Sequence, residues 1–121
     1  MKKKALIIVG HGSRLRGFQA AMEKVARNFR ADKSFGLVLC AYLEITPPSI
    51  PDAIDLCLKK GAREIFVLPY FLLTGRHVTE DIPKIVSAAR KKHGRKVRIK
   101  LCSYLGYHEK IVEVARERIH Q

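Results

Sequence analysis

The sequence predicts an α/β fold in which a four-stranded parallel sheet, of strand order 2-1-3-4, carries helices on both faces. Short apolar segments alternate four times with longer segments whose apolar residues recur at helical spacing. No internal repeat or low-complexity linker divides the 121 residues. Hydrophobic residues form 47% of the chain, which suffices for one compact core, so we expect a single domain spanning residues 1–121.

The first unit begins with a continuous apolar run, Lys4 to Gly10, as expected of a strand that is buried on both faces. A helix is expected from about Leu15 to Arg30, because its apolar residues recur every three or four positions. These residues are Phe18, Met22, Val25, Ala26 and Phe29. Ser13 precedes this helix and is a candidate for its cap.

The second unit has the same form. Residues Leu37 to Leu43 predict a strand, and Pro47-Pro48 end it. The apolar residues between Ile50 and Leu58 predict a second helix. Gly61 is well placed to end this helix, because glycine adopts the left-handed conformation of a helix C-terminus.

The third strand is expected over Glu64 to Leu68, closed by Pro69. Residues Leu72 to Val78 then predict a loop centred on Gly75. Thr79 or Asp81 can cap the next helix. Pro83 is compatible with that helix only because it falls in the first turn.

This third helix is expected to end near His93-Gly94, because the cations of its last turn interact favourably with the negative end of the helix dipole. Lys96 to Cys102 predict the fourth strand, and Tyr107 to Ile119 the last helix. Four βα units in succession imply a parallel sheet, and right-handed crossovers favour the order 2-1-3-4.

In that order the first and third strands are neighbours, and the chain winds away from them in opposite directions. The crevice outside their carboxyl ends is where open α/β sheets bind ligands. His11 follows the first strand and His77 follows the third. We therefore expect the two histidines to converge at this crevice, although they lie far apart in sequence.

Imidazole is the commonest protein ligand for transition metals and titrates near neutral pH. His77 lies close to a predicted helix start, where the dipole favours the neutral ring and keeps a lone pair available. The pair therefore predicts a metal or proton-transfer site. The alternatives are a hydrogen-bonded strand-end histidine for His11 and a solvent-facing loop histidine for His77.

Glu44 ends the second strand at the same edge of the sheet. It can complete a set of two histidines and one carboxylate, which suits Co, Ni or Fe. It can equally accept a proton, or simply pair with an arginine or lysine. Arg14, Arg16 and Arg76 flank the crevice and can hold carboxylates, or they can be solvated.

Lysine and arginine number 24 against 11 acidic residues, a formal charge of +13 that attracts anions. Nucleic acid, a membrane surface and a polycarboxylate metabolite all fit this charge. The basic stretch Lys91 to Lys100 has no interleaved aromatic residues, which disfavours a nucleic-acid strip.

The three scattered cysteines are expected to be buried in a reduced interior. We find no secretory signal pattern and no run long enough to cross a bilayer, and therefore expect a cytoplasmic protein.

Several of these segments resemble one known family, the short CbiX-type sirohydrochlorin chelatases of the class II chelatase superfamily. The resemblance spans nearly the whole chain, and the segment around His77 is the most specific part of it. The segments that carry it are Ile7–Arg14 (IIVGHGSR), Tyr42–Glu44 with Pro48–Ile50, Leu68–Pro83 (LPYFLLTGRHVTEDIP) and, more weakly, Leu105–His108.

The resemblance implies a flavodoxin-like, chelatase-type domain equal to half of a bilobal chelatase, and a homodimer that rebuilds the cleft. The implied activity is ATP-independent insertion of a divalent metal into sirohydrochlorin, with Co²⁺ for cobalamin first and Ni²⁺ for coenzyme F430 or Fe²⁺ for siroheme as alternatives. A tetrapyrrole or metal carrier without turnover also stays open. No nucleotide, nucleic acid or membrane partner is implied.

By this resemblance, His11 and His77 bind the metal, and Glu44 is a further catalytic group. Ser13, Arg14 and Arg76 are expected to contact the carboxylates of the tetrapyrrole. Many relatives carry a histidine-rich stretch thought to store metal, and this chain has none.

Overall fold

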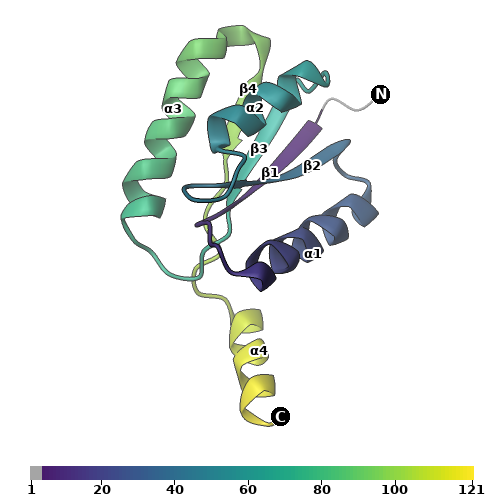
Figure 1. Cartoon of the computed structure of the whole chain (residues 1–121), viewed down its shortest axis with the longest axis vertical. Helices are drawn as coiled ribbons and strands as arrows, with labels where there is room; N and C mark the ends of the chain where they lie inside the picture. Colours follow the sequence, from purple (N-terminus) through teal and green to yellow (C-terminus); the bar gives the residue numbers. More distant parts are fainter. Residues whose placement is uncertain (1–3) are drawn as a thin grey trace.

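A computed structural model describes residues 4–121 as one parallel sheet with its helices (Figure 1). The predicted alternation of four strands and four helices is confirmed. The elements are β1 (Lys4–Gly10), α1 (Arg16–Asp32), β2 (Leu37–Tyr42), α2 (Ile50–Lys59), β3 (Glu64–Pro69), the π-helical turn η1 (His77–Asp81), α3 (Ile82–His93), the 3₁₀ turn η2 (Gly94–Lys96), β4 (Arg98–Leu101) and α4 (Glu109–Ile119). None of the helices within residues 4–121 has the length and apolar content that a bilayer span requires.

The strands follow the predicted order, β2-β1-β3-β4, and all neighbours are parallel. β1 therefore lies between β2 and β3. Its last residue, Gly10, pairs with Tyr42, and Val9 pairs with Pro69. The carboxyl ends of these three strands consequently meet at one edge of the sheet, which is the edge expected to hold a ligand.

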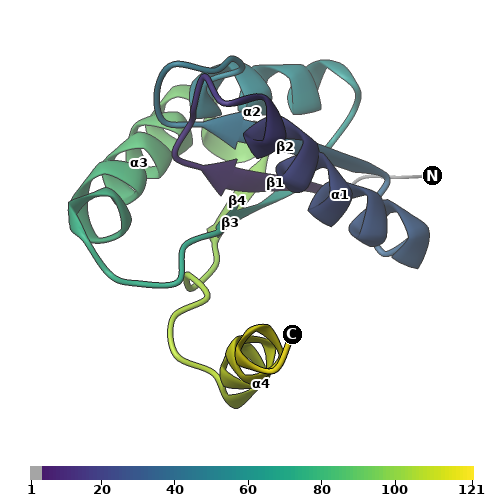
Figure 2. The same ribbon diagram turned by 60° about the horizontal axis from the view of Figure 1, so that its bottom comes forward.

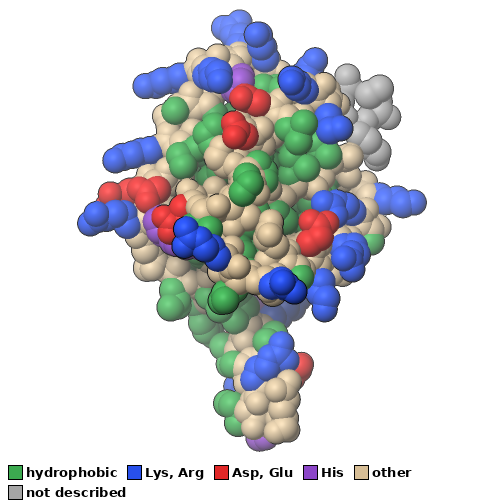
Figure 3. Space-filling view, viewed as in Figure 1, with side chains coloured by type: hydrophobic (Ala, Val, Ile, Leu, Met, Phe, Trp, Pro, Cys, Tyr) green, Lys and Arg blue, Asp and Glu red, His purple; other side chains and the backbone are tan. Residues whose placement is uncertain are grey.

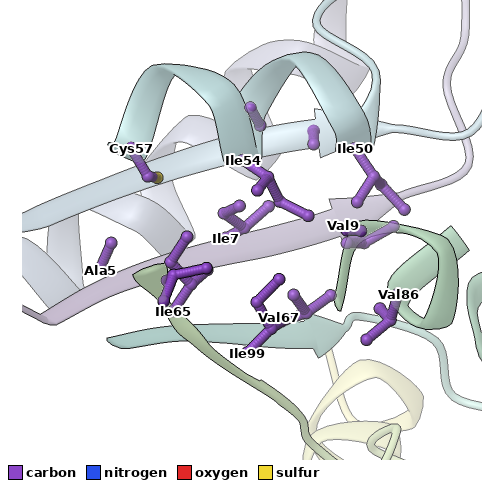
Figure 4. Close-up of a cluster of buried hydrophobic side chains, with 14 of the residues drawn as sticks. Ala5, Ile7, Val9, Ile50, Ile54, Cys57, Ile65, Val67, Val86 and Ile99 are labelled. Carbon is purple, nitrogen blue, oxygen red and sulfur yellow. The ribbon is translucent and has the colours of Figure 1, made fainter. Parts of the chain in front are cut away.

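The odd-numbered residues of β1 face α2 and α3, and these form the larger of two apolar clusters (Figure 4). Ala5, Ile7 and Val9 are fully buried there. Ile54 of α2 and Val86 of α3 pack against them from the two helices. Burying β1 on both faces explains why its sequence is continuously apolar rather than alternating.

The even-numbered residues of β1 face α1. Leu6 and Ile8 pack there against Met22 and Ala26, which are the two buried residues of that helix. α1 covers β1 and β2. On the same face, Phe66 and Leu68 of β3 are only partly buried and lie beyond this helix. One face of the sheet is thus fully covered, while the other is open over β3 and β4.

The predicted helix ends are correct in part. Gly61 follows α2 with a φ of 95°, as expected. Ser49, which was not predicted as a cap, caps that helix by accepting the amide of Asp52 at 3.2 Å. Ser13 does not cap α1, because the cap position belongs to Leu15. The Ser13 hydroxyl instead accepts the amide of Leu15 at 3.0 Å, before the helix begins.

The region around His77 also differs from the prediction. His77 opens a helical turn continuous with α3, rather than lying in a loop. Asp81 stands at the N-cap position of α3, as predicted, but its side chain makes no capping bond and turns back to His77. The Thr79 hydroxyl donates to the Gly75 carbonyl at 3.0 Å. Pro83 has no N–H to donate to Thr79, which permits the wider π-helical turn just before it.

α4 projects away from the rest of the molecule (Figures 1 and 2). It has no buried residue, although Ile111, Val112 and Val114 give it apolar positions. Val114 and Ile119 are 46% and 75% exposed. An amphipathic helix without a covered face has lost the packing that normally stabilises it.

Gly12 is the position where the turn after β1 tolerates no side chain. Its φ is 110°, and a Cβ at this residue would overlap the Glu44 carbonyl oxygen. We predict that Gly12→Ala lowers the free energy of unfolding by about 2–4 kcal/mol, from backbone strain and displacement of the Glu44 strand end. Urea denaturation followed by circular dichroism measures this.

Gly17→Ala is the matched control, because a Cβ at Gly17 of α1 meets nothing within 4 Å. That change should leave stability the same or raise it by up to about 1 kcal/mol. Equal urea midpoints for Gly12→Ala and Gly17→Ala would contradict the prediction that the turn at Gly12 excludes a side chain.

Candidate functional site

The predicted crevice lies at the carboxyl ends of β1, β2 and β3. His11 follows β1 directly, and Glu44 stands two residues beyond β2. Backbone pairing continues past both strands, since the amide of Leu43 donates to Gly10 and that of Glu44 donates to His11, each at 3.1 Å. This extension fixes the backbones of His11 and Glu44 side by side.

His11 and His77 meet at this edge, and their predicted convergence is confirmed. Their ring centroids are 4.8 Å apart, with an angle of 62° between the ring planes. His77 reaches this position from the turn η1, because the amide of Tyr70 bonds to Val9 and directs the chain after β3 along the same edge. Both side chains stay about four-tenths exposed, so they are accessible to a ligand.

Each histidine is held by one carboxylate. His11 Nε2 lies 2.7 Å from Glu44 Oε2, and His77 Nδ1 lies 2.8 Å from Asp81 Oδ2. An ionised carboxylate only accepts hydrogen bonds, so the contacting ring nitrogen is the donor in each pair. In the neutral rings, the lone pairs then remain on Nδ1 of His11 and Nε2 of His77.

Asp81 was missed as a site residue in the sequence, where it was assigned to a helix cap. The signal that could have found it is its spacing of four residues from His77 at the start of a helix, which places two side chains on one face. A carboxylate behind a metal-binding histidine commonly fixes its tautomer and ring orientation. Asp81 occupies that place relative to His77.

Two hollows flank the histidines. The first, of about 370 Å³, adjoins His11 and has mainly apolar walls. They come from α1 and from the chain after β3, and include Phe18, Met22, Tyr70 and Phe71. The second, of about 400 Å³, adjoins His77 and contains Glu44, Asp81 and Lys84. The site therefore has an apolar side and a charged side.

Exposed apolar side chains surround the same edge. Leu15, Leu72 and Leu73 are between 52% and 81% exposed, and they lie in the segments that follow β1 and β3. Tyr107 stands 83% exposed at the base of α4, where the amide of Gly106 donates to the Phe71 carbonyl at 3.3 Å. Contiguous exposed apolar surface of this kind marks a ligand or protein contact.

The remaining predicted residues are less tied to the crevice. Arg14 and Arg76 are exposed, and neither forms a salt bridge within residues 4–121. The Ser13 hydroxyl accepts the amide of Leu15, and its backbone amide and carbonyl bond to the hydroxyl of Thr46 in the loop after β2. The contacts predicted between these three residues and a tetrapyrrole stay a prediction. Arg16 is the first residue of α1 and is exposed.

No three His, Cys, Asp or Glu side chains within residues 4–121 form a ready-made metal site. The predicted set of His11, His77 and Glu44 is thus not assembled as ligands here, since Glu44 is turned to the His11 ring. The cysteines do not contribute: burial raises the pKa of the Cys57 thiol to about 11, which keeps it protonated at neutral pH. A metal at this edge would meet two imidazoles first.

The other three histidines have structural contacts or positions at helix ends. His93 lies 3.3 Å from Asp55, between α3 and α2. His108 caps α4, accepting the amide of Lys110 at 3.1 Å. His120 is the C-terminal cap of the same helix.

Comparison with known proteins points to one family. The model of the CbiX family matches residues 5–121. A chloroplastic sirohydrochlorin ferrochelatase of Arabidopsis thaliana is 35% identical over 94% of this chain and 50% of its own length. A sirohydrochlorin cobaltochelatase of Saccharolobus solfataricus is 31% identical over 96% of this chain and 93% of its own length.

Solved structures agree with the sequence comparison. The sirohydrochlorin chelatase SirB from Bacillus subtilis subspecies spizizenii, in complex with cobalt, is 30% identical, with a TM-score of 0.88. It matches 98% of this chain and 50% of its own. SirB from Bacillus subtilis with Fe³⁺ is 31% identical, with a TM-score of 0.84, over 96% of this chain and 46% of its own.

This chain therefore spans about half the length of several relatives and nearly all of another. The relatives named above include both a cobaltochelatase and a ferrochelatase, so their names agree on sirohydrochlorin and differ in the metal. By the match of the family model over residues 5–121, and by the fold that it shares with solved chelatases, the chain belongs to the CbiX family.

Proposed function

We propose that this protein inserts a divalent metal, Co²⁺ first among the candidates, into sirohydrochlorin for cobalamin biosynthesis in the cytoplasm. The observation that carries the proposal is the pair His11 and His77, whose rings lie 4.8 Å apart beside an apolar hollow. Both metal and macrocycle are substrates here. Ni²⁺ and Fe²⁺ are the alternative metals, since imidazole and carboxylate ligands suit all three ions.

The substrate fits the electrostatics and shape of the crevice. Sirohydrochlorin is a flat, apolar macrocycle with carboxylates around its rim, and a protein of net charge +13 raises its local concentration. The apolar hollow beside His11 can take the ring face, with Phe18 and Tyr70 in contact. Arg14 and Arg76, which are exposed at the rim, can pair with the carboxylates.

The two histidines can hold the metal weakly enough to release it. Few protein ligands leave open positions that the macrocycle nitrogens can occupy during transfer. Insertion exchanges one divalent ion for the inner N–H protons of the macrocycle, so a base must accept them. Glu44, hydrogen-bonded to His11 at 2.7 Å, is in place to receive protons through that ring or directly.

Insertion into sirohydrochlorin tests the proposal, and the visible spectrum of the macrocycle follows it. The protein should accelerate insertion of at least one of Co²⁺, Ni²⁺ and Fe²⁺ over the metal-only control. We expect His11→Ala and His77→Ala each to lower the rate by about 100-fold or more, because each removes a metal-binding lone pair. His120→Ala, at the far end of α4, is the matched control and should keep the wild-type rate.

Acceleration with none of the three ions would overturn the enzyme assignment and favour a carrier with the same pocket. Nucleic-acid binding that weakens steeply with salt, and that survives the double variant His11→Ala with His77→Ala while chelation is absent, would favour a nucleic-acid-binding module. Comparing the three wild-type rates also ranks the metals.

Asp81 is a positioning residue in this proposal, acting through His77. We predict that Asp81→Ala weakens Co²⁺ binding by about 10-fold, because the His77 ring loses its fixed tautomer. Equilibrium titration of the protein with Co²⁺ measures the affinity. Nitrogen NMR of the His77 ring should show the change in tautomer, which a general loss of stability would not produce.

The neighbouring acid Glu80 provides the control, because it is exposed on the same turn and forms no hydrogen bond or salt bridge within residues 4–121. Glu80→Ala should change the affinity less than about twofold. Equal losses for the two variants would indicate a general effect of negative charge rather than positioning.

We also propose that the protein works as a homodimer in which α4 packs on the second copy. Three features support this assignment: the uncovered apolar positions of α4, the partly buried Phe66 and Leu68 on the open face of the sheet, and the exposed leucines around the crevice. The expected resemblance to one half of a bilobal chelatase supports the same pairing.

Sedimentation equilibrium tests the dimer. The wild-type protein should sediment at about twice its 13.7 kDa monomer mass. The double variant Val114→Ser with Ile119→Ser should dissociate at least about tenfold more readily, because it removes apolar area from α4. Glu113→Ser with Glu117→Ser, on the same helix, should leave the dimer intact, and a monomeric wild type would overturn the assignment.

A further inference from the structure

Another hollow, separate from the two that flank the histidines, lies at the opposite edge of the sheet, where α2 and α3 end. It has a volume of about 690 Å³. Four cationic side chains line it, and they come from the last residue of α2, the residue before β3, the last turn of α3 and the turn η2. These are Lys59, Arg63, Lys92 and Lys96. The proposed metal insertion makes no use of this hollow.

Asp55 is the one carboxylate among the residues that line this hollow, and it already contacts His93 and Lys92. Its Oδ1 lies 3.3 Å from His93 Nε2, and its Oδ2 lies 3.9 Å from Lys92 Nζ. Within residues 4–121, Lys59, Arg63 and Lys96 have no carboxylate within 4.0 Å. The like charges of these three side chains repel one another, and an anion bound between them would reduce that repulsion.

The hollow continues into an apolar one of about 200 Å³ between α2 and α3. The two share Asp55, Lys92 and His93, and the walls of the smaller one are otherwise Pro51, Ile85, Ala88 and Ala89. Figure 3 shows lysine and arginine side chains gathered over the ends of α2 and α3, with hydrophobic side chains below them between the helices. A basic end thus adjoins an apolar extension.

We propose that this hollow binds a small organic polyanion, with phosphate or carboxylate groups against Lys59, Arg63 and Lys96 and its apolar part between α2 and α3. Arg63 Nη1 already donates to the Ala62 carbonyl at 2.9 Å, which leaves the other N–H groups of this exposed guanidinium for an anionic group, and the two lysines add point charges. The apolar extension gives the hydrocarbon part of the ligand a surface against which to bury.

Calorimetric titration of the metal-free, full-length protein tests the proposal, at about 0.15 M salt to screen general attraction. Tripolyphosphate and benzenehexacarboxylate are the two probes, and the tighter one identifies the anionic group. We expect saturable binding of one molecule per chain. The triple variant Lys59→Ser, Arg63→Ser and Lys96→Ser should weaken it at least about tenfold.

The triple variant Lys24→Ser, Arg27→Ser and Lys110→Ser is the matched control, because it removes the same charges from exposed positions on α1 and α4. It should change the affinity less than about twofold. Arg14→Ser with Arg76→Ser reports separately on the histidine crevice, and a larger loss there than in the Lys59, Arg63 and Lys96 variant would assign the binding to the crevice and overturn the proposal. Equal losses in both triple variants would assign the binding to net charge. That result, or the absence of binding by both probes, would overturn the proposal. If a triple variant fails to fold, the single variants are measured in its place.

Discussion

The burial of β1 between β2 and β3 is the constraint on which the rest of the structure depends. Ala5, Ile7 and Val9 pack against α2 and α3, while Leu6 and Ile8 pack against α1. A strand in this position has no free edge, so the chain leaving Gly10 can only turn into the crevice at its end. His11 therefore enters the site as a direct consequence of how the core is filled.

The same constraint sets the chemistry of the crevice. Parallel pairing brings the ends of β2 and β3 to the end of β1, and so brings Glu44 and η1 to His11. Each imidazole then has one carboxylate partner and one nitrogen left for a ligand. An open pair of imidazoles suits a metal that must be handed on, whereas a closed set of four ligands would retain it.

Two parts of the molecule, α4 and the sheet face over β3 and β4, are left uncovered by this packing. α4 carries apolar residues that no helix or strand of the same chain buries within the described residues, and the sheet face over β3 and β4 is only partly covered. The basic hollow between the ends of α2 and α3 lies at the opposite edge from the histidines. The two edges of one small sheet thus present different chemistry, with two histidines and their carboxylates at one and a group of cations at the other.

The sequence by itself determined the four βα units, the strand order and the meeting of His11 with His77. Hydrophobic periodicity is a local property, and right-handed crossovers leave few topologies, so these features need no knowledge of side-chain positions. Only the tertiary structure decided that Asp81 holds His77 instead of capping a helix, that Glu44 turns to His11, and that α4 stands clear of the sheet. The Glu44 contact and the position of α4 depend on neighbours distant in sequence, which leave no period in it. The Asp81–His77 pair lies within one helical turn, but side-chain geometry decides that the carboxylate bonds to the ring and not to a backbone amide.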